Sequence, residues 1–186
     1  MLGLPAEVRC VRIRQAKGFA LIDLLFVCGI IGILAAIGLP RLLMAKQAAG
    51  SASAIGSMRA IHSGELTFAL TCGGGFYAPK LTTLGTPPPG SPAGFVSPTV
   101  GRADLVTQSG YNVQVSATPF ATAPASCNGL AAGEAGQGYK AAADPNEPNN
   151  VRFFAINANG IVWEDTSSLL AGMPEVGEPA SGHPIR

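Results

Sequence analysis

The residue types that could support catalysis do not form a recognisable set along this chain. His62 stands beside Ser63, but a catalytic histidine needs a third group to orient it, so we expect a surface residue. Glu164 and Asp165 are adjacent, and adjacent residues of a strand point to opposite faces. The glycines at 73–75 lack the Lys-Ser or Lys-Thr that follows the glycines of a phosphate-binding loop. We therefore expect a protein that is not an enzyme and holds no cofactor.

Asp23 suggests a different kind of chemistry, because it is the one charge within the apolar run Phe19–Leu39. About 20 apolar residues are enough for a helix to cross a bilayer core. A carboxylate at the centre of such a helix costs roughly 2.5–3.5 kcal/mol on insertion scales and is usually paired. Four basic residues and one acidic residue precede the run, which indicates an N-terminus held in the cytoplasm. The run predicts one transmembrane helix in which Asp23 has a partner.

The residues around this run resemble the N-termini of type IV pilins and of type II secretion pseudopilins. The resemblance rests on Gly18-Phe19, on Asp23 and on the apolar stretch that continues to Pro40. In that family a prepilin peptidase cleaves after the glycine and methylates the new N-terminal residue. The resemblance implies a leader of residues 1–18, cleavage between Gly18 and Phe19, and N-methylation of Phe19. The family usually has Glu where this chain has Asp23.

The implied cleavage would give Asp23 a partner. The new α-amino group at Phe19 would lie four residues earlier on the same helix face. Asp23 could pair with the amine of its own chain, or with the amine of a neighbouring subunit, which would set the axial register of subunits in a fibre. The alternative is a charge that is merely tolerated near the membrane interface.

Helical periodicity continues beyond the apolar run and ends at the glycines 73–75. Pro40 would remove one backbone hydrogen bond and kink this helix. We divide the chain into leader, transmembrane helix half, amphipathic helix half, globular head and flexible tail, at residues 1–18, 19–39, 40–71, 72–170 and 171–186. The positions expected to face the head are Leu42, Ala45, Ala49, Ala52, Ile55, Met58, Ile61, Leu66 and Ala69.

The sequence of the head predicts a small antiparallel sheet. Residues 77–98 are dense in proline and glycine, so we expect a surface connection without regular helix or central strand. The strand candidates are residues 111–116, 139–143, 151–156 and 161–163, the last two joined by an Asn-Gly turn. The expected fold class is α+β, a pilin-like roll in which this sheet packs on the long helix.

Cys72 and Cys127 are the two cysteines expected on the exported side, since Cys10 lies in the implied leader and Cys28 in the apolar run. In an oxidising compartment they would form a disulfide, which would stabilise the fold by about 3–4 kcal/mol. A metal site is the rival hypothesis, but the chain has no C-x-x-C motif and its histidines lack ligand spacing. We expect the disulfide.

Asp144 and Glu147 lie in a segment rich in oxygen ligands and form a weak calcium candidate. The segment lacks EF-hand spacing, and Asp, Asn and Pro are common turn formers, so we expect no metal site.

The net charge of the chain is +1, and it falls to about −2 without the leader. The remaining basic residues are scattered, so we expect no nucleic-acid partner.

The expected function is therefore mechanical. The resemblance implies a structural subunit of a type IV pilus-like filament, inserted in a bacterial inner membrane and then assembled into a periplasmic or extracellular fibre. Its expected partners are the prepilin peptidase and other pilin-like subunits. The alternatives are a pseudopilin of a type II secretion system, a minor tip or adhesin subunit, and an uncleaved membrane-anchored domain.

Overall fold

The computed structural model describes residues 21–185 and divides them into two compact units that meet after Leu43. The helix α1, Leu21–Thr71, is continuous over 51 residues and contributes to both units. It continues through Pro40 without interruption, and the kink expected there stays a prediction. Gly18 and Phe19, the implied cleavage and methylation site, lie outside the described residues.

The helix α1 ends at the glycines, as the sequence predicts. The amide of Gly73 donates to the Phe68 carbonyl at 2.7 Å, and the amide of Gly75 donates to the Ala69 carbonyl at 2.8 Å. Gly74 has a φ of 60°, a left-handed conformation that glycine adopts without a steric penalty. These contacts satisfy the last carbonyls of the helix and turn the chain towards the head.

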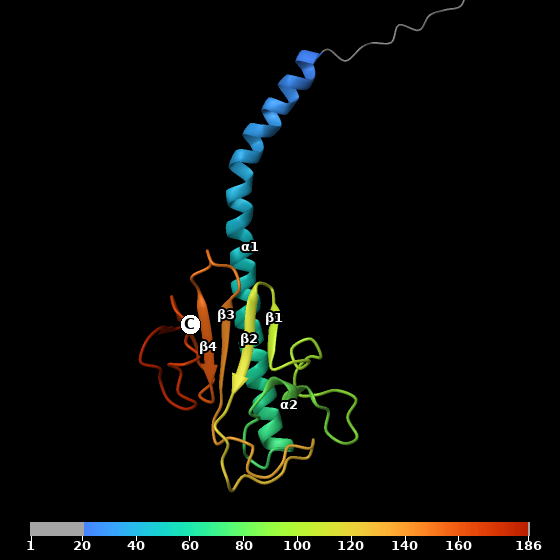
Figure 1. Cartoon of the computed structure of the whole chain (residues 1–186), viewed down its shortest axis with the longest axis vertical. Helices are drawn as coiled ribbons and strands as arrows, with labels where there is room; N and C mark the ends of the chain where they lie inside the picture. The colour runs from blue at the N-terminus through green and yellow to red at the C-terminus, as the bar shows by residue number, and fades with distance from the viewer. Residues whose placement is uncertain (1–20, 186) are drawn as a thin grey trace, which may run out of the picture. The chain divides into compact units, whose positions relative to one another are not determined.

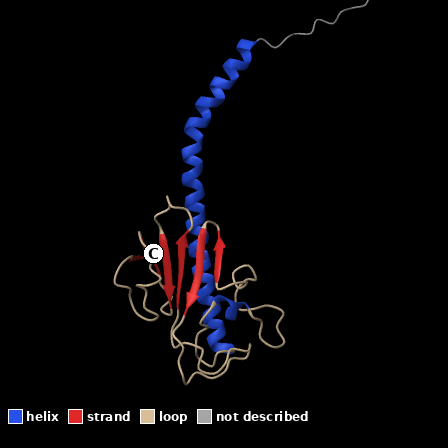
Figure 2. Ribbon diagram, viewed as in Figure 1, coloured by secondary structure: helices blue, strands red, loops and turns tan. Residues whose placement is uncertain are grey.

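Six strands form one antiparallel sheet in which each strand pairs with the next one along the chain (Figures 1 and 2). They are β1 (Leu105–Gln108), β2 (Tyr111–Ser116), β3 (Lys140–Pro145), β4 (Phe153–Asn157), β5 (Val162–Asp165) and β6 (His183–Pro184). The four predicted strands correspond to β2 to β5, whereas β1 and β6 were missed. A long helix packed on a small antiparallel sheet confirms the α+β class.

The inner face of the sheet packs on the part of α1 that belongs to the head (Figure 1). Along β2, Tyr111, Val113 and Val115 are buried, and the polar residues between them are half-buried. This alternation places the apolar side chains on the face that contacts α1. The hydrophobic core of the head is formed between these two layers.

The contact face of α1 differs from the predicted stripe. Met58, Ile61 and Ala69 are buried as expected. The predicted positions that are exposed instead are Leu42, Ala45, Ala49, Ala52 and Leu66. The buried positions are Gly50, Ser51, Ala54, Ser57, Met58, Ile61, Gly64, Glu65, Phe68 and Ala69. Many of these are small or polar because the backbone of the head approaches the helix too closely for large side chains.

Residues 77–98 were expected to lack regular helix, but they contain α2, Leu81–Gly85. Leu81 and Leu84 are fully buried in the main core. Their spacing of three residues places both side chains on one side of a single helical turn. Burial of these two leucines therefore stabilises a short helix. The prediction missed it because it considered only the density of proline and glycine.

The outer face of the sheet carries a second, smaller core. It consists of Ala142, Ala155, Trp163, Leu169 and Met173. Met173 is only 2% exposed, and β6 pairs with β5 through two residue pairs. Residues 171–186, expected to be a flexible tail, therefore pack in part against the sheet.

Gly64→Ala is expected to destabilise the head by about 1–3 kcal/mol. A Cβ at this position would lie 2.7 Å from the Phe95 carbonyl oxygen and 2.8 Å from Val96 Cγ1. The measurement is chemical denaturation of the full chain in detergent, followed by fluorescence of Trp163, the single tryptophan.

Gly56→Ala is the matched control for this substitution. A Cβ at Gly56 would meet no atom within 4 Å beyond the nearby helix backbone. Its stability is expected to stay equal or to rise by up to about 1 kcal/mol, because alanine favours helix. Equal unfolding midpoints for the two variants would contradict the close approach of α1 to the head.

Candidate functional site

The apolar part of α1 has no element covering it among the described residues. Its large apolar side chains between Leu21 and Leu39 are 43–75% exposed. The helix is long and apolar enough there to cross a membrane. An apolar surface of this size exposed to water would be unfavourable, so the segment needs lipid or other protein around it.

Three glycines lie within this apolar segment. No atom beyond the nearby helix backbone lies within 4 Å of a Cβ placed at Gly29, Gly32 or Gly38. Small residues of this kind allow the backbones of membrane helices to approach one another closely. The head half of α1 uses Gly50 and Gly64 in this way, since a Cβ at either one would lie within 3 Å of a backbone oxygen of the head.

Asp23 and Arg41 are the only charged residues from Leu21 to Leu43. Neither forms an ion pair with another residue that the structure describes. The amine at Phe19, the implied partner of Asp23, lies outside the described residues, so that pairing stays a prediction. Arg41 was not among the predicted site residues.

Cys72 and Cys127 form the predicted disulfide. Cys72 directly follows α1, and the Cys127 amide donates to the Cys72 carbonyl at 3.1 Å. Nearby, the rings of Phe76 and Phe120 stack with their centroids 5.7 Å apart. The covalent bond thus attaches a long irregular segment of the head to the end of the helix. Cys28 is exposed and forms no disulfide with another cysteine that the structure describes.

A buried polar cluster lies where α1 meets the segment before β3. Glu65 is fully buried; its Oε2 accepts a hydrogen bond from the Ala78 amide at 2.9 Å, and its Oε1 has no partner among the described residues. His62 Nδ1 and the Tyr139 hydroxyl are 2.6 Å apart. A Cβ on Gly160 would lie 2.7 Å from His62 Nε2. His62 is therefore half-buried and packed, and the expectation of a surface residue is wrong.

The environment of this cluster favours neutral side chains. Burial raises the pKa of Glu65 to about 8, against the lowering effect of the Ala78 amide. Burial also raises the pKa of Tyr139, with a further contribution from the charge of Glu65, and burial lowers the pKa of His62. Glu65 lies four residues after Ile61 and three before Phe68, a spacing that could have placed it on the buried face from sequence alone.

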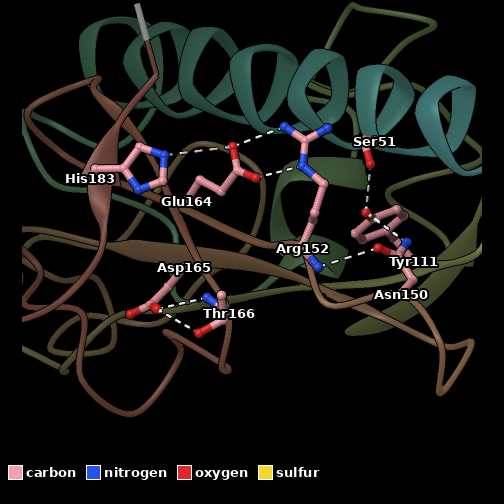
Figure 3. A network of polar contacts seen from close by, with 8 residues as sticks. All are labelled: Ser51, Tyr111, Asn150, Arg152, Glu164, Asp165, Thr166 and His183. Carbon is pink, nitrogen blue, oxygen red and sulfur yellow. Dashed lines mark hydrogen bonds and ion pairs between the residues drawn. The ribbon is translucent and has the colours of Figure 1, made fainter.

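A second polar network links α1, β2, the residues before β4, β5 and β6 (Figure 3). Arg152 donates from Nε and Nη2 to the two carboxylate oxygens of Glu164, at 2.5 and 2.9 Å. These hydrogen bonds lower the pKa of Glu164 and raise the pKa of Arg152. His183 Nε2, on β6, lies 4.0 Å from Glu164 Oε2, so the Glu164 carboxylate lies between Arg152 and the C-terminal strand.

The Tyr111 hydroxyl connects this network to α1 (Figure 3). It lies 2.9 Å from Ser51 Oγ on the helix and accepts a hydrogen bond from Asn150 Nδ2 at 2.9 Å. Asn150 Oδ1 in turn accepts from the Arg152 amide at 3.2 Å. The connection between β3 and β4 is thereby fixed against the helix and β2.

Asp144 and Glu147, the weak calcium candidate, have separate protein partners. Asp144 Oδ2 accepts from Ser168 Oγ at 2.7 Å, and Glu147 Oε1 accepts from Lys46 Nζ at 2.7 Å. Within residues 21–185, no group of three or more His, Cys, Asp or Glu side chains is placed to hold a metal ion. A calcium site at these two residues gains no support from this geometry.

Comparison of the chain with protein-family models, with curated proteins and with solved structures finds no match in any of the three.

Glu65→Gln is expected to stabilise the head increasingly as the pH rises from about 4.5 to about 8. The folded state holds the Glu65 proton up to about pH 8, whereas an exposed glutamate releases it near pH 4.5. The wild type therefore loses up to about 1.4 kcal/mol per pH unit in this window through Glu65 alone. Glutamine does not titrate and can still accept from the Ala78 amide.

The measurement is the difference in unfolding free energy between Glu65→Gln and the wild type from pH 4 to pH 9. His62 is present in both proteins, so its own titration cancels to first order. A difference that stays constant over this range would contradict a buried, mainly protonated Glu65.

Replacing both disulfide cysteines, Cys72→Ala with Cys127→Ala, is expected to lower the stability of the head by about 3–4 kcal/mol. The physical reason is the greater freedom of the unfolded chain once a loop of 55 residues is no longer closed. Thermal unfolding in detergent measures the loss. Cys28→Ala is the control and is expected to leave the midpoint unchanged, because Cys28 is exposed and unbonded. Equal midpoints for the two variants would mean that the bond contributes nothing to stability.

Proposed function

We propose that this protein is a structural subunit of a type IV pilus-like filament. It is first held in the membrane by the apolar half of α1 and then assembled into a fibre through that same half, with the disulfide-bonded head at the surface. The N-terminal motif around Gly18, Phe19 and Asp23 supports this family. The proposal includes cleavage after Gly18, methylation of Phe19, and pairing of Asp23 with the new amine.

The observation that carries the proposal is that α1 belongs both to the apolar segment and to the core of the head. One continuous helix supplies both an uncovered apolar segment and the central core element of the head. A removable targeting segment has no need to share a helix with the core of its domain. A subunit that must transmit force between a fibre axis and a surface domain does need such a connection.

The disulfide fits an exported head. Disulfides persist in oxidising compartments outside the cytoplasm, and Cys72 and Cys127 are both on the far side of the apolar segment from the N-terminus. The basic flank before Phe19 favours a cytoplasmic N-terminus, which places the head on the other side of the membrane. Orientation and cysteine chemistry therefore support the same location.

A second candidate is a pseudopilin of a type II secretion system, which shares the same N-terminal motif. The covalent attachment of the long 73–126 segment to α1 favours the pilus, since a head exposed on a long fibre gains from such a bond. A minor tip or adhesin subunit remains the third candidate.

The test is mass spectrometry of the chain from membrane and sheared-fibre fractions of the native host. The expected result is a chain that begins at N-methyl-Phe19, is abundant in sheared fibres and carries the Cys72–Cys127 bond. The same mature chain confined to the membrane fraction would favour a pseudopilin or a minor subunit. A steady-state protein that retains residues 1–18 would overturn the filament function and leave a membrane-anchored domain.

A further inference from the structure

The sheet of the head has one open edge, strand β1. β1 has four residues, and none of them is charged or is a proline. The opposite edge strand, β6, has two residues and includes Pro184, which has no N–H to donate. Proteins usually protect a sheet edge with charges, proline or a covering segment, because unpaired backbone groups there pair with other chains. Of the two edges, β1 is therefore the one able to accept a further strand.

The strand pairings show which backbone groups of β1 are free. Tyr111 stands opposite Pro145 of β3, which has no N–H, so Tyr111 exchanges its hydrogen bonds with Gln108 of β1 instead. Hydrogen-bonded and non-hydrogen-bonded pairs alternate along an antiparallel ladder. Leu105 and Thr107 therefore direct their N–H and C=O groups away from β2. Neither residue forms a backbone hydrogen bond with described residues outside the sheet.

A groove of about 350 Å³ lies beside this edge. Its lining residues are Thr99, Arg102, Val106, Thr107, Gln108 and Ser109. Val106 pairs with Val113 and shares its buried face, whereas Leu105 points to the other face of the sheet and is 56% exposed. A strand docked at β1 would therefore meet free backbone groups and an exposed apolar side chain together.

The groove carries a positive charge. Arg102 is the only charged residue that lines it. Arg102 is exposed and forms no ion pair with another residue that the structure describes. The carboxylate of Asp104, close by in the chain, already has partners, since it lies 3.7 Å from Lys80 Nζ and accepts a hydrogen bond from Thr82 Oγ1. A carboxylate on a docked segment would therefore be attracted to Arg102.

A second copy of this chain does not fit as the partner of β1 through its own β1. The strands run along the head part of α1 (Figure 1): Tyr111 at one end of β2 contacts Ser51, and Tyr139, next to the strand residue that pairs with the other end of β2, contacts His62. An antiparallel pair of two β1 strands would therefore reverse one head relative to the other. Identical chains enter a membrane in the same orientation, so their heads are not reversed.

We propose that the β1 edge is a docking site for an extended segment of a partner protein, which adds a strand to the sheet and places an Asp or Glu side chain beside Arg102. Backbone hydrogen bonds to Leu105 and Thr107 would provide the affinity, and the ion pair with Arg102 would provide the specificity. The inference goes beyond the proposed function, because a filament subunit and an anchored domain would present this edge alike.

Hydrogen exchange of the full chain in detergent tests whether the edge is open. The amides of Leu105 and Thr107 are expected to exchange at least tenfold faster than those of Val106 and Gln108, which bond to β2. Equal protection of all four amides would mean that the edge is already covered. Protection of Leu105 and Thr107 that increases with protein concentration would mean that a second copy covers it. Either result would overturn the inference.

A library of random heptapeptides, selected on the full chain in detergent, tests the choice of partner. The selected peptides are expected to be enriched in Asp or Glu and to slow the exchange of the Leu105 and Thr107 amides. Arg102→Glu is expected to select Lys or Arg instead. Arg59→Glu is the matched control: it makes the same charge change at an exposed position that does not line the groove, and it should select the same peptides as the wild type.

Thr107→Pro tests the backbone contact. Proline removes the outward N–H of residue 107, which the sheet does not use, so the selected peptides are expected to bind at least tenfold more weakly. Thr107→Ala keeps this N–H and is expected to bind as the wild type does, with a thermal midpoint close to that of Thr107→Pro. The selected peptides with N-methylated amides should also fail to bind the wild type, an arm that requires no variant to fold. A library without binders, or N-methylated peptides that bind as well as their parents, would overturn the inference.

Discussion

The head depends on the close packing of α1 against backbone from distant parts of the chain. A Cβ on Gly50 would lie 2.8 Å from the Ser109 carbonyl oxygen, and a Cβ on Gly64 would lie 2.7 Å from that of Phe95. Such distances leave no room for a side chain, so the helix presents glycine and serine where an ordinary amphipathic helix presents leucine. The β1–β2 turn and the segment before Val96 reach α1 for this reason, and the apolar side chains of β2 then fill the remaining space.

Close packing also buries polar side chains, and Glu65 and Asn157 meet the cost of burial in different ways. Glu65 keeps one hydrogen bond and holds its proton into the neutral range, so the core carries no full charge there. Asn157, fully buried at the end of β4, donates from Nδ2 to the carbonyls of Pro174 and Gly177 at 3.0 and 2.7 Å. The Asn157 side chain thereby holds residues 174–177 against the end of β4, beside the backbone hydrogen bond from the Ala158 amide to the Glu175 carbonyl.

The apolar half of α1, unlike the head half, is not packed against other described residues. Its large side chains are exposed, its glycines meet no neighbour, and its two charges have no partner among the described residues. The exposed apolar side chains are unfavourable in water and favourable in lipid, whereas a charge is favourable in water and costly in lipid until it is paired. The head half of α1 uses Gly50 and Gly64 for close approach within the chain.

The sequence alone determined the features that depend on a local residue pattern, and the disulfide, for which only one pair of cysteines follows the apolar run. The apolar run predicted the helix, Asn159-Gly160 predicted the turn between β4 and β5, and Cys72 and Cys127 were the only two cysteines after the apolar run. The tertiary structure decided which residues of α1 are buried, that α2 forms among prolines, and that the C-terminal segment packs on the sheet. These depend on contacts between segments far apart in the chain, where the space left by a neighbouring backbone, and not periodicity, selects the side chain.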